Sequence, residues 1–81
     1  VVLTIRIVEQ YAVAVVDIQL NGETFNASGP LSVSRLLVQL GIDCRRVAVE
    51  HNRVVLKKTA YTSTLISDGD EIEVVNFVGG G

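Results

Sequence analysis

The Asn21-Gly22 pair constrains the fold more than any other feature of this sequence. Both residues tolerate the positive φ angles of a type I′ turn, and such a pair between two alternating segments is the strongest short-range signal for a β-hairpin. Residues 16–20 alternate between apolar and polar, which is the period of a half-buried strand. A two-residue loop places Ile18 opposite Phe25 on one face, so the register of the predicted hairpin agrees with its hydrophobic pattern.

A short helix is predicted over residues 33–40. Ser32 is a good N-cap, and apolar residues then recur at i, i+3, i+4 and i+7 from Val33 to Leu40. Gly41 stands where a left-handed residue commonly ends a helix. A helix of this length needs a sheet to cover its apolar stripe.

Three more strands are predicted at 47–50, 54–56 and 71–77, with an irregular segment at 57–64 and a turn at 67–70. The order is therefore hairpin, helix, two strands and a last strand, which is the β-grasp or ubiquitin-like arrangement. We expect an α+β domain with a mixed sheet of about five strands and one main helix packed on one face. A right-handed crossover would place the last strand parallel to the first and next to it.

Residues 1–14 have no place in that plan. Apolar residues at positions 3, 5 and 7 alternate with Thr4 and Arg6, so this segment is either an extra edge strand or a loose extension. We divide the chain into this extension (1–14), a β-grasp domain (15–78) and a flexible glycine tail (79–81).

Composition excludes several classes of function. The 81-residue chain has a formal charge of −2, and its basic residues are scattered as short pairs, so nucleic acid is not an expected partner. Its one cysteine cannot form an internal disulfide. The apolar start is too short to span a bilayer and lacks a basic region before it, so we expect neither a signal peptide nor a membrane anchor. A cytoplasmic protein, monomeric on its own, is the simplest expectation.

Candidate catalytic side chains are few. His51 stands in a predicted connection and is expected to be a solvated turn residue. Cys44 follows the helix with no identifiable base to activate it, so we interpret it as incidental. Asp68 and Asp70 are expected to hold local backbone N–H groups in their turn, because the other oxygen ligands of a calcium loop are absent. We therefore expect no enzyme activity, no metal and no cofactor bound by the chain itself.

The last residues point to a different kind of chemistry. The final predicted strand leads into Phe77 and Val78 and then into Gly79, Gly80 and Gly81. Glycines have no Cβ to collide with the walls of a narrow channel and adopt any required φ. Such a tail is either a frayed terminus or an arm that presents its α-carboxylate inside another protein.

Several segments together resemble one known family, the sulfur carriers of thiamine biosynthesis (ThiS), over about residues 16–81. They are Asp-Gly-Asp-Glu-Ile-Glu-Val-Val-Asn-Phe-Val and the glycines at 68–81, Ile-Gln-Leu-Asn-Gly-Glu at 18–23, Ser32-Val33 with Leu36-Leu37, and Arg-Val-Ala-Val-Glu at 46–50. Residues 1–14 extend beyond the usual start of that family near Asp17, and Cys44 stands where Pro is common.

The resemblance implies a mechanism. A partner adenylating enzyme, which itself binds the ATP, would activate the Gly81 carboxylate as an acyl-adenylate. A persulfide on a desulfurase or sulfurtransferase would then replace AMP and leave a C-terminal thiocarboxylate, from which thiazole synthase would take the sulfur. Gly81 would be the modified residue. Alternation along the last strand independently predicts that Glu71, Glu73, Val75 and Phe77 lie opposite the core-facing Ile72 and Val74. We therefore expect the partner-binding residues to be Val75, Phe77, Val78, Gly79 and Gly80.

Three alternatives stay open at this point. The small subunit of molybdopterin synthase shares the fold and the glycine end, but that family typically carries Phe-Pro-Pro near its end, whereas the only proline here is Pro30. A ubiquitin-like modifier uses the same tail chemistry. A plain interaction domain with a fortuitous glycine tail is the third.

Overall fold

The computed structural model describes residues 4–8 and 11–76, with eleven elements in chain order. They are β1 (Thr4–Val8), β2 (Tyr11–Leu20), β3 (Glu23–Ser28), β4 (Leu31–Ser32), α1 (Val33–Gln39), the 3₁₀ turn η1 (Cys44–Arg46), β5 (Val47–His51), β6 (Val54–Val55), the 3₁₀ turn η2 (Lys58–Ala60), β7 (Leu65–Ile66) and β8 (Glu71–Asn76).

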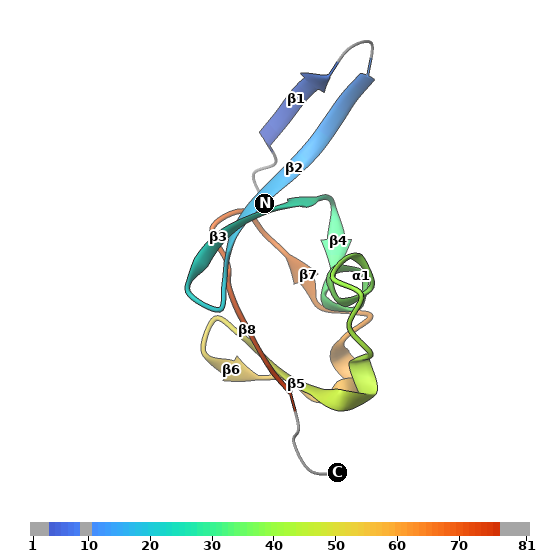
Figure 1. Cartoon of the computed structure of the whole chain (residues 1–81), viewed down its shortest axis with the longest axis vertical. Coiled ribbons are helices and arrows are strands. Elements are labelled where there is room, and N and C mark those ends of the chain that lie inside the picture. The colour runs from blue at the N-terminus through green and yellow to red at the C-terminus, as the bar shows by residue number, and fades with distance from the viewer. Residues whose placement is uncertain (1–3, 9–10, 77–81) are drawn as a thin grey trace.

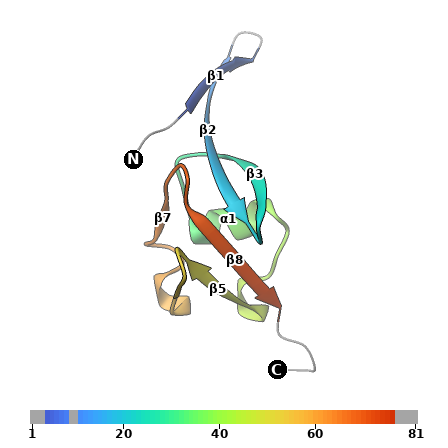
Figure 2. The same cartoon turned by 90° about the vertical axis from the view of Figure 1, so that its left-hand side faces the viewer.

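The main sheet is mixed and runs in the order β1-β2-β8-β5-β6, with β3 also paired to β2. Strand β8 lies parallel to β2 and antiparallel to β5, and α1 packs on one face of the sheet (Figures 1 and 2). The predicted β-grasp architecture is confirmed, including the parallel pairing of the last strand with the first strand of the hairpin. Strands β4 and β7 form a separate two-stranded sheet that the sequence did not predict.

The hairpin and the helix form for the reasons that the sequence indicated. Asn21 and Gly22 have φ angles of 49° and 83°, and Ile18 lies opposite Phe25. Ser32 Oγ accepts a hydrogen bond from the Arg35 N–H at 3.2 Å, as an N-cap does. At the other end, Gly41 has φ 70° and donates its N–H to the carbonyl of Val38, so α1 ends one residue earlier than expected, at Gln39.

The core lies between α1 and the sheet. Its largest fully buried side chains come from one face of the helix, from the facing sides of β2, β5 and β8, and from β7: Val16, Ile18, Val33, Leu36, Leu37, Val47, Val49, Ile66 and Ile72. Burial of these aliphatic groups provides the main stabilisation, about 1.5–3 kcal/mol for each fully buried large side chain. On the opposite face of the sheet, Gln19, Glu71, Glu73 and Val75 are exposed.

The N-terminal extension is strand, not loop, where the structure describes it. Residues 4–8 form β1, and residues 11–14 continue β2 backwards, so that β2 is ten residues long. The hairpin of β1 and the first part of β2 projects from the rest of the molecule (Figure 1). With this hairpin included, the molecule measures 46 × 23 × 22 Å.

Candidate functional site

Strand β8 leads towards the predicted site residues. Glu71, Glu73 and Val75 are exposed on its outer face, whereas Ile72 is buried beneath it. Of the residues proposed to bind partners, Val75 is 51% exposed. The other proposed site residues (Phe77, Val78, Gly79, Gly80 and the modified Gly81) lie outside the described part of the chain. The structure therefore locates the strand that precedes the tail.

Two asparagines hold β8 at separate points. The Asn52 backbone N–H donates to the Glu71 carbonyl at 2.8 Å, and Asn52 Oδ1 accepts from the Glu71 N–H at 2.9 Å. Further along, Asn21 Oδ1 accepts from the Val74 N–H at 2.7 Å, and Asn21 Nδ2 donates to the Val74 carbonyl at 3.2 Å. Both asparagines have positive φ, at 51° and 49°, which Asn adopts more readily than most residues.

The Asn21 contacts replace strand pairing where it stops. Strand β2 pairs with β8 only at Gln19–Glu71 and Leu20–Ile72, because the chain turns away at Asn21. The Asn21 backbone N–H still donates to the Ile72 carbonyl, and its side chain then pairs with Val74. On the other side, β5 pairs with β8 from Ile72 to Asn76. Strand β8 is thus held on both edges up to Val74, two residues before it ends.

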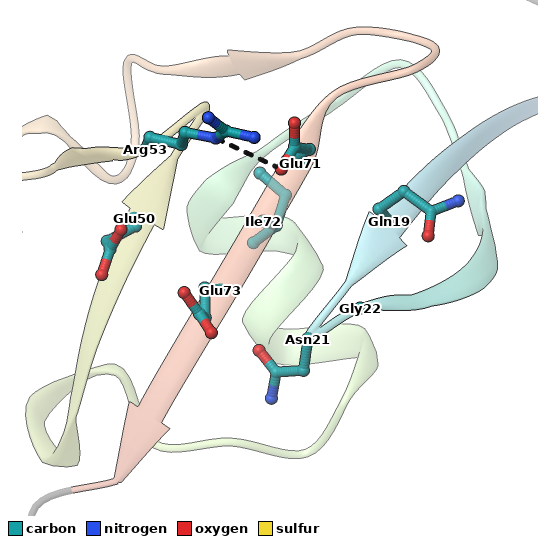
Figure 3. Close-up of a pocket in the computed structure, with 8 residues that line it drawn as sticks. All are labelled: Gln19, Asn21, Gly22, Glu50, Arg53, Glu71, Ile72 and Glu73. Carbon is teal, nitrogen blue, oxygen red and sulfur yellow. Dashed lines mark ion pairs between the residues drawn. The ribbon is translucent and has the colours of Figure 1, made fainter.

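A pocket of about 260 Å³ lies on the face of the sheet opposite α1. It is lined by Gln19, Asn21, Gly22, Glu50, Arg53, Glu71, Ile72 and Glu73 (Figure 3). Three carboxylates and one guanidinium are therefore gathered here. The Arg53 Nε lies 3.8 Å from Glu71 Oε2, and both side chains are more than half exposed, so this ion pair contributes little to stability.

The other two carboxylates belong to cross-strand partners. Glu50 on β5 lies directly opposite Glu73 on β8. Like charges in such a cross-strand pair destabilise a sheet. Strand pairing continues from this acidic pair to Ala48 and Val75, so the exposed face changes from acidic to apolar towards the end of β8.

The turn before β8 contains a hydrogen-bonded network. His51 Nε2 lies 2.7 Å from Asp70 Oδ2, Ser67 N–H donates to the same oxygen at 2.8 Å, and Asn52 Nδ2 donates to Oδ1 at 3.2 Å. Burial of the Asp70 carboxyl by itself raises its pKa, but these hydrogen bonds together outweigh burial, and the pKa lies below its usual value. The expectation that His51 is solvated was wrong: its side chain is only 21% exposed, because it ends β5 against the Asp70 turn.

The same turn is fixed to β2. Asp68 Oδ1 accepts from the Asp17 N–H at 2.8 Å, and the Gly69 N–H donates to the Asp17 carbonyl at 2.7 Å. Asp70 thus holds a local backbone N–H group, that of Ser67, as expected from the sequence. The N–H group that Asp68 holds is not local, because Asp17 is 51 positions away. These contacts place the start of β8 beside β2 and fix the direction in which β8 runs.

Cys44 lies on the surface at the start of η1. Its neighbour Arg45 is engaged elsewhere: Arg45 Nη2 donates to Asp43 Oδ2 at 2.9 Å and Nε to Oδ1 at 3.1 Å. Hydrogen bonds from the Arg45 side chain and N–H hold the pKa of the Asp43 carboxyl at about 2. Over residues 4–8 and 11–76, no group of three or more His, Cys, Asp or Glu residues is placed to hold a metal ion.

Sequence reasoning found β8 and its exposed face but missed both asparagine contacts and the His51–Asp70 pair. Asn21 was interpreted only as a turn residue, because its partner Val74 is 53 positions away. None of the described helices is long and apolar enough to cross a membrane.

Comparisons with known proteins agree with one another. The model of the ThiS family matches residues 18–81. The sulfur carrier protein ThiS of Bacillus subtilis (strain 168) is 34% identical over 65 residues, which cover 79% of this chain and 98% of that protein. The crystal structure of the thiamine biosynthesis protein ThiS from Geobacter metallireducens superposes with a TM-score of 0.70 at 35% identity, over 80% of this chain and 99% of the other.

A longer relative matches as well. A thiazole synthase of Paramagnetospirillum magneticum (strain ATCC 700264 / AMB-1) is 45% identical over 62 residues, or 76% of this chain. The chain corresponds to only 19% of the length of that relative.

Proposed function

Because the chain belongs to the ThiS family, we propose that it is a sulfur carrier in thiamine biosynthesis and that the Gly81 carboxylate carries the sulfur. The observation that carries this proposal is the position of β8, which is held at Glu71 and Val74 and ends at Asn76, three residues before the glycines in the sequence. The family match also favours the thiamine pathway over the molybdopterin pathway, the modifier and the plain interaction domain.

A free carboxylate is a poor electrophile, so the proposed chemistry begins with activation. A partner enzyme with bound ATP transfers AMP to the Gly81 carboxylate and releases pyrophosphate. A persulfide donor displaces the AMP, and a thiol cleaves the resulting acyl disulfide, which leaves a thiocarboxylate on Gly81. In this proposal, the described residues of the chain need only position the tail.

The outer face of β8 is the proposed docking surface for the adenylating enzyme. Val75 is exposed near the end of β8, and Glu71 and Glu73 are exposed earlier on the same face of this strand. The unfavourable Glu50–Glu73 pair is relieved by a partner that offers basic groups, because complementary charge steers association and fixes its register. Phe77, the next residue of the same alternation, would extend the apolar part of this surface.

Thiazole synthase is the proposed acceptor of the sulfur. The support is that a protein named thiazole synthase contains a segment that is 45% identical to this chain over 62 residues. The desulfurase or sulfurtransferase is proposed from the chemistry alone.

The experiment is reconstitution with purified adenylating enzyme, ATP and a persulfide donor, followed by intact-mass measurement. The proposal predicts a mass change equal to replacement of one oxygen by sulfur, located on Gly81 by fragmentation. A product conjugated to a lysine of another protein would identify a modifier instead, and an unmodified chain would contradict both functions.

A further inference from the structure

The two edges of β8 are held over different lengths. On the β5 side, strand pairing runs from Ile72 to Asn76. On the β2 side, strand pairing stops at Ile72, because the chain turns away at Asn21. In the part of the chain that the structure describes, Val75 and Asn76 at the end of β8 therefore pair on the β5 side alone.

Val74 is the last residue of β8 that is held from the β2 side. The chain on that side donates to the carbonyl of Asp70 from the Gln19 N–H and to the carbonyl of Ile72 from the Asn21 N–H. Alternation makes Val74 the next residue whose backbone groups face this side. The side chain of Asn21, which lies beside β8 just past the end of β2 (Figure 3), takes the place of a strand there and pairs with both backbone groups of Val74.

This pairing can be removed without altering the strand ladder, because a side chain alone makes it. Loss of the Asn21 amide would leave the backbone groups of Val74 unpaired and residues 74–76 held by β5 only. Exposed backbone hydrogen bonds with few supporting contacts open most readily. Residues that open in the free protein must be ordered again when a partner binds, which weakens binding. The Asn21 side chain therefore preorganises the last part of β8.

We propose that Asn21 is a positioning residue for the adenylation of Gly81, a role that rests on the proposed sulfur carrier function. Asn21 acts through Val74. It keeps the end of β8 paired, and so it fixes Val75 on the proposed docking surface and fixes Asn76, five residues before Gly81 in the sequence. Because Val74 is seven residues before the reacting carboxylate, the effect belongs to recognition by the partner and not to the transfer of AMP.

Asn52 provides a matched control at the other end of the same strand. Like Asn21, it has a positive φ, donates its backbone N–H to a carbonyl of β8 and accepts from an N–H of β8 through Oδ1. Its contact is with Glu71, the first residue of β8. Asn21→Gly and Asn52→Gly each remove the side-chain hydrogen bonds and keep the backbone contact, but only Asn21→Gly acts at the end nearest the tail.

ATP–pyrophosphate exchange with the adenylating enzyme, with the carrier as the varied substrate, tests the proposal. Asn21→Gly should raise the KM for the carrier about tenfold and leave kcat within about twofold of the wild type, because the added cost is paid on binding. Asn52→Gly should keep both values of the wild type. Thermal unfolding followed by circular dichroism verifies that each variant is folded at the assay temperature, so a general loss of stability would not separate the two variants.

Amide hydrogen exchange locates the cause of the change in KM. The Val74 N–H, which donates to Asn21 Oδ1, should lose protection in Asn21→Gly and keep it in Asn52→Gly. A Val74 N–H that is still protected in Asn21→Gly would overturn the proposal.

The kinetic outcomes separate this inference from the function on which it rests. A KM of Asn21→Gly equal to that of the wild type, or an equal rise in Asn52→Gly, would overturn the positioning role alone, because the wild type would still be adenylated. A wild type that supports no exchange would contradict the proposed function, and the positioning role with it.

Discussion

The side chain of Asn21 pairs with both backbone groups of Val74, accepting from its N–H at 2.7 Å and donating to its carbonyl at 3.2 Å. A residue from the turn between β2 and β3 thus extends the edge pairing of β8 by two positions, from Ile72 to Val74, beyond the point at which β2 turns away. This contact couples the turn that defines the fold to the strand that leads to the proposed site.

Removal of the Asn21 amide should destabilise the protein measurably. Asn21→Gly retains the positive φ but loses both hydrogen bonds, and it should lower the free energy of unfolding by about 1–2 kcal/mol in urea titrations. Asn21→Ala should cost about 1–2 kcal/mol more, because alanine adopts a left-handed conformation with difficulty. Equal stability of Asn21→Gly and the wild type would show that the amide contacts contribute nothing.

Acid should weaken the fold through Asp70. The pKa of its carboxyl is lowered in the folded state, so the ionised form contributes stability above the usual value of 3.8, and this contribution is lost as the pH falls through the folded-state pKa. Asp70→Asn should therefore be less stable than the wild type near neutral pH, and the two free energies should converge in acid. Urea titrations across this range measure the difference; a constant difference at every pH would contradict the assignment to Asp70.

Short-range sequence signals were sufficient to predict much of the fold. The Asn21-Gly22 turn and the Ser32 cap of α1 act over a few residues, and they were predicted from the sequence because their partners are close along the chain. The strands β4 and β7 were missed, since two-residue strands have no period to detect.

The polar contacts that the sequence did not predict join residues far apart in the chain. The Asn21–Val74 and His51–Asp70 contacts join residues 53 and 19 positions apart, and nothing local to either residue indicates its partner. The structure of residues 1–14 was left undecided for a similar reason. The alternation in residues 3–7 does not reveal whether another strand lies beside this segment. The exposed alternation of β8, in contrast, was predicted correctly up to Val75.

Substitution on the outer face of β8 should weaken docking without unfolding the domain. Val75→Lys and Phe77→Lys should each raise the Kd for the adenylating enzyme about tenfold or more, because apolar contact is replaced by a charge. Leu65→Lys is the control, since Leu65 is also exposed but lies in the separate β4–β7 sheet. Calorimetric titration measures the three affinities. If all three variants bind like the wild type, the docking surface lies elsewhere.

The most direct measurement of sulfur carrier function is adenylate formation on a chain with a blocked tail. Gly80→Val and a variant with one bulky residue added after Gly81 should keep the thermal unfolding midpoint of the wild type. In ATP–pyrophosphate exchange with the adenylating enzyme, the wild type should support exchange and gain one sulfur by intact mass, whereas both variants should support neither. Normal exchange by Gly80→Val would contradict the proposal that the glycine tail threads into the partner and presents Gly81 to ATP.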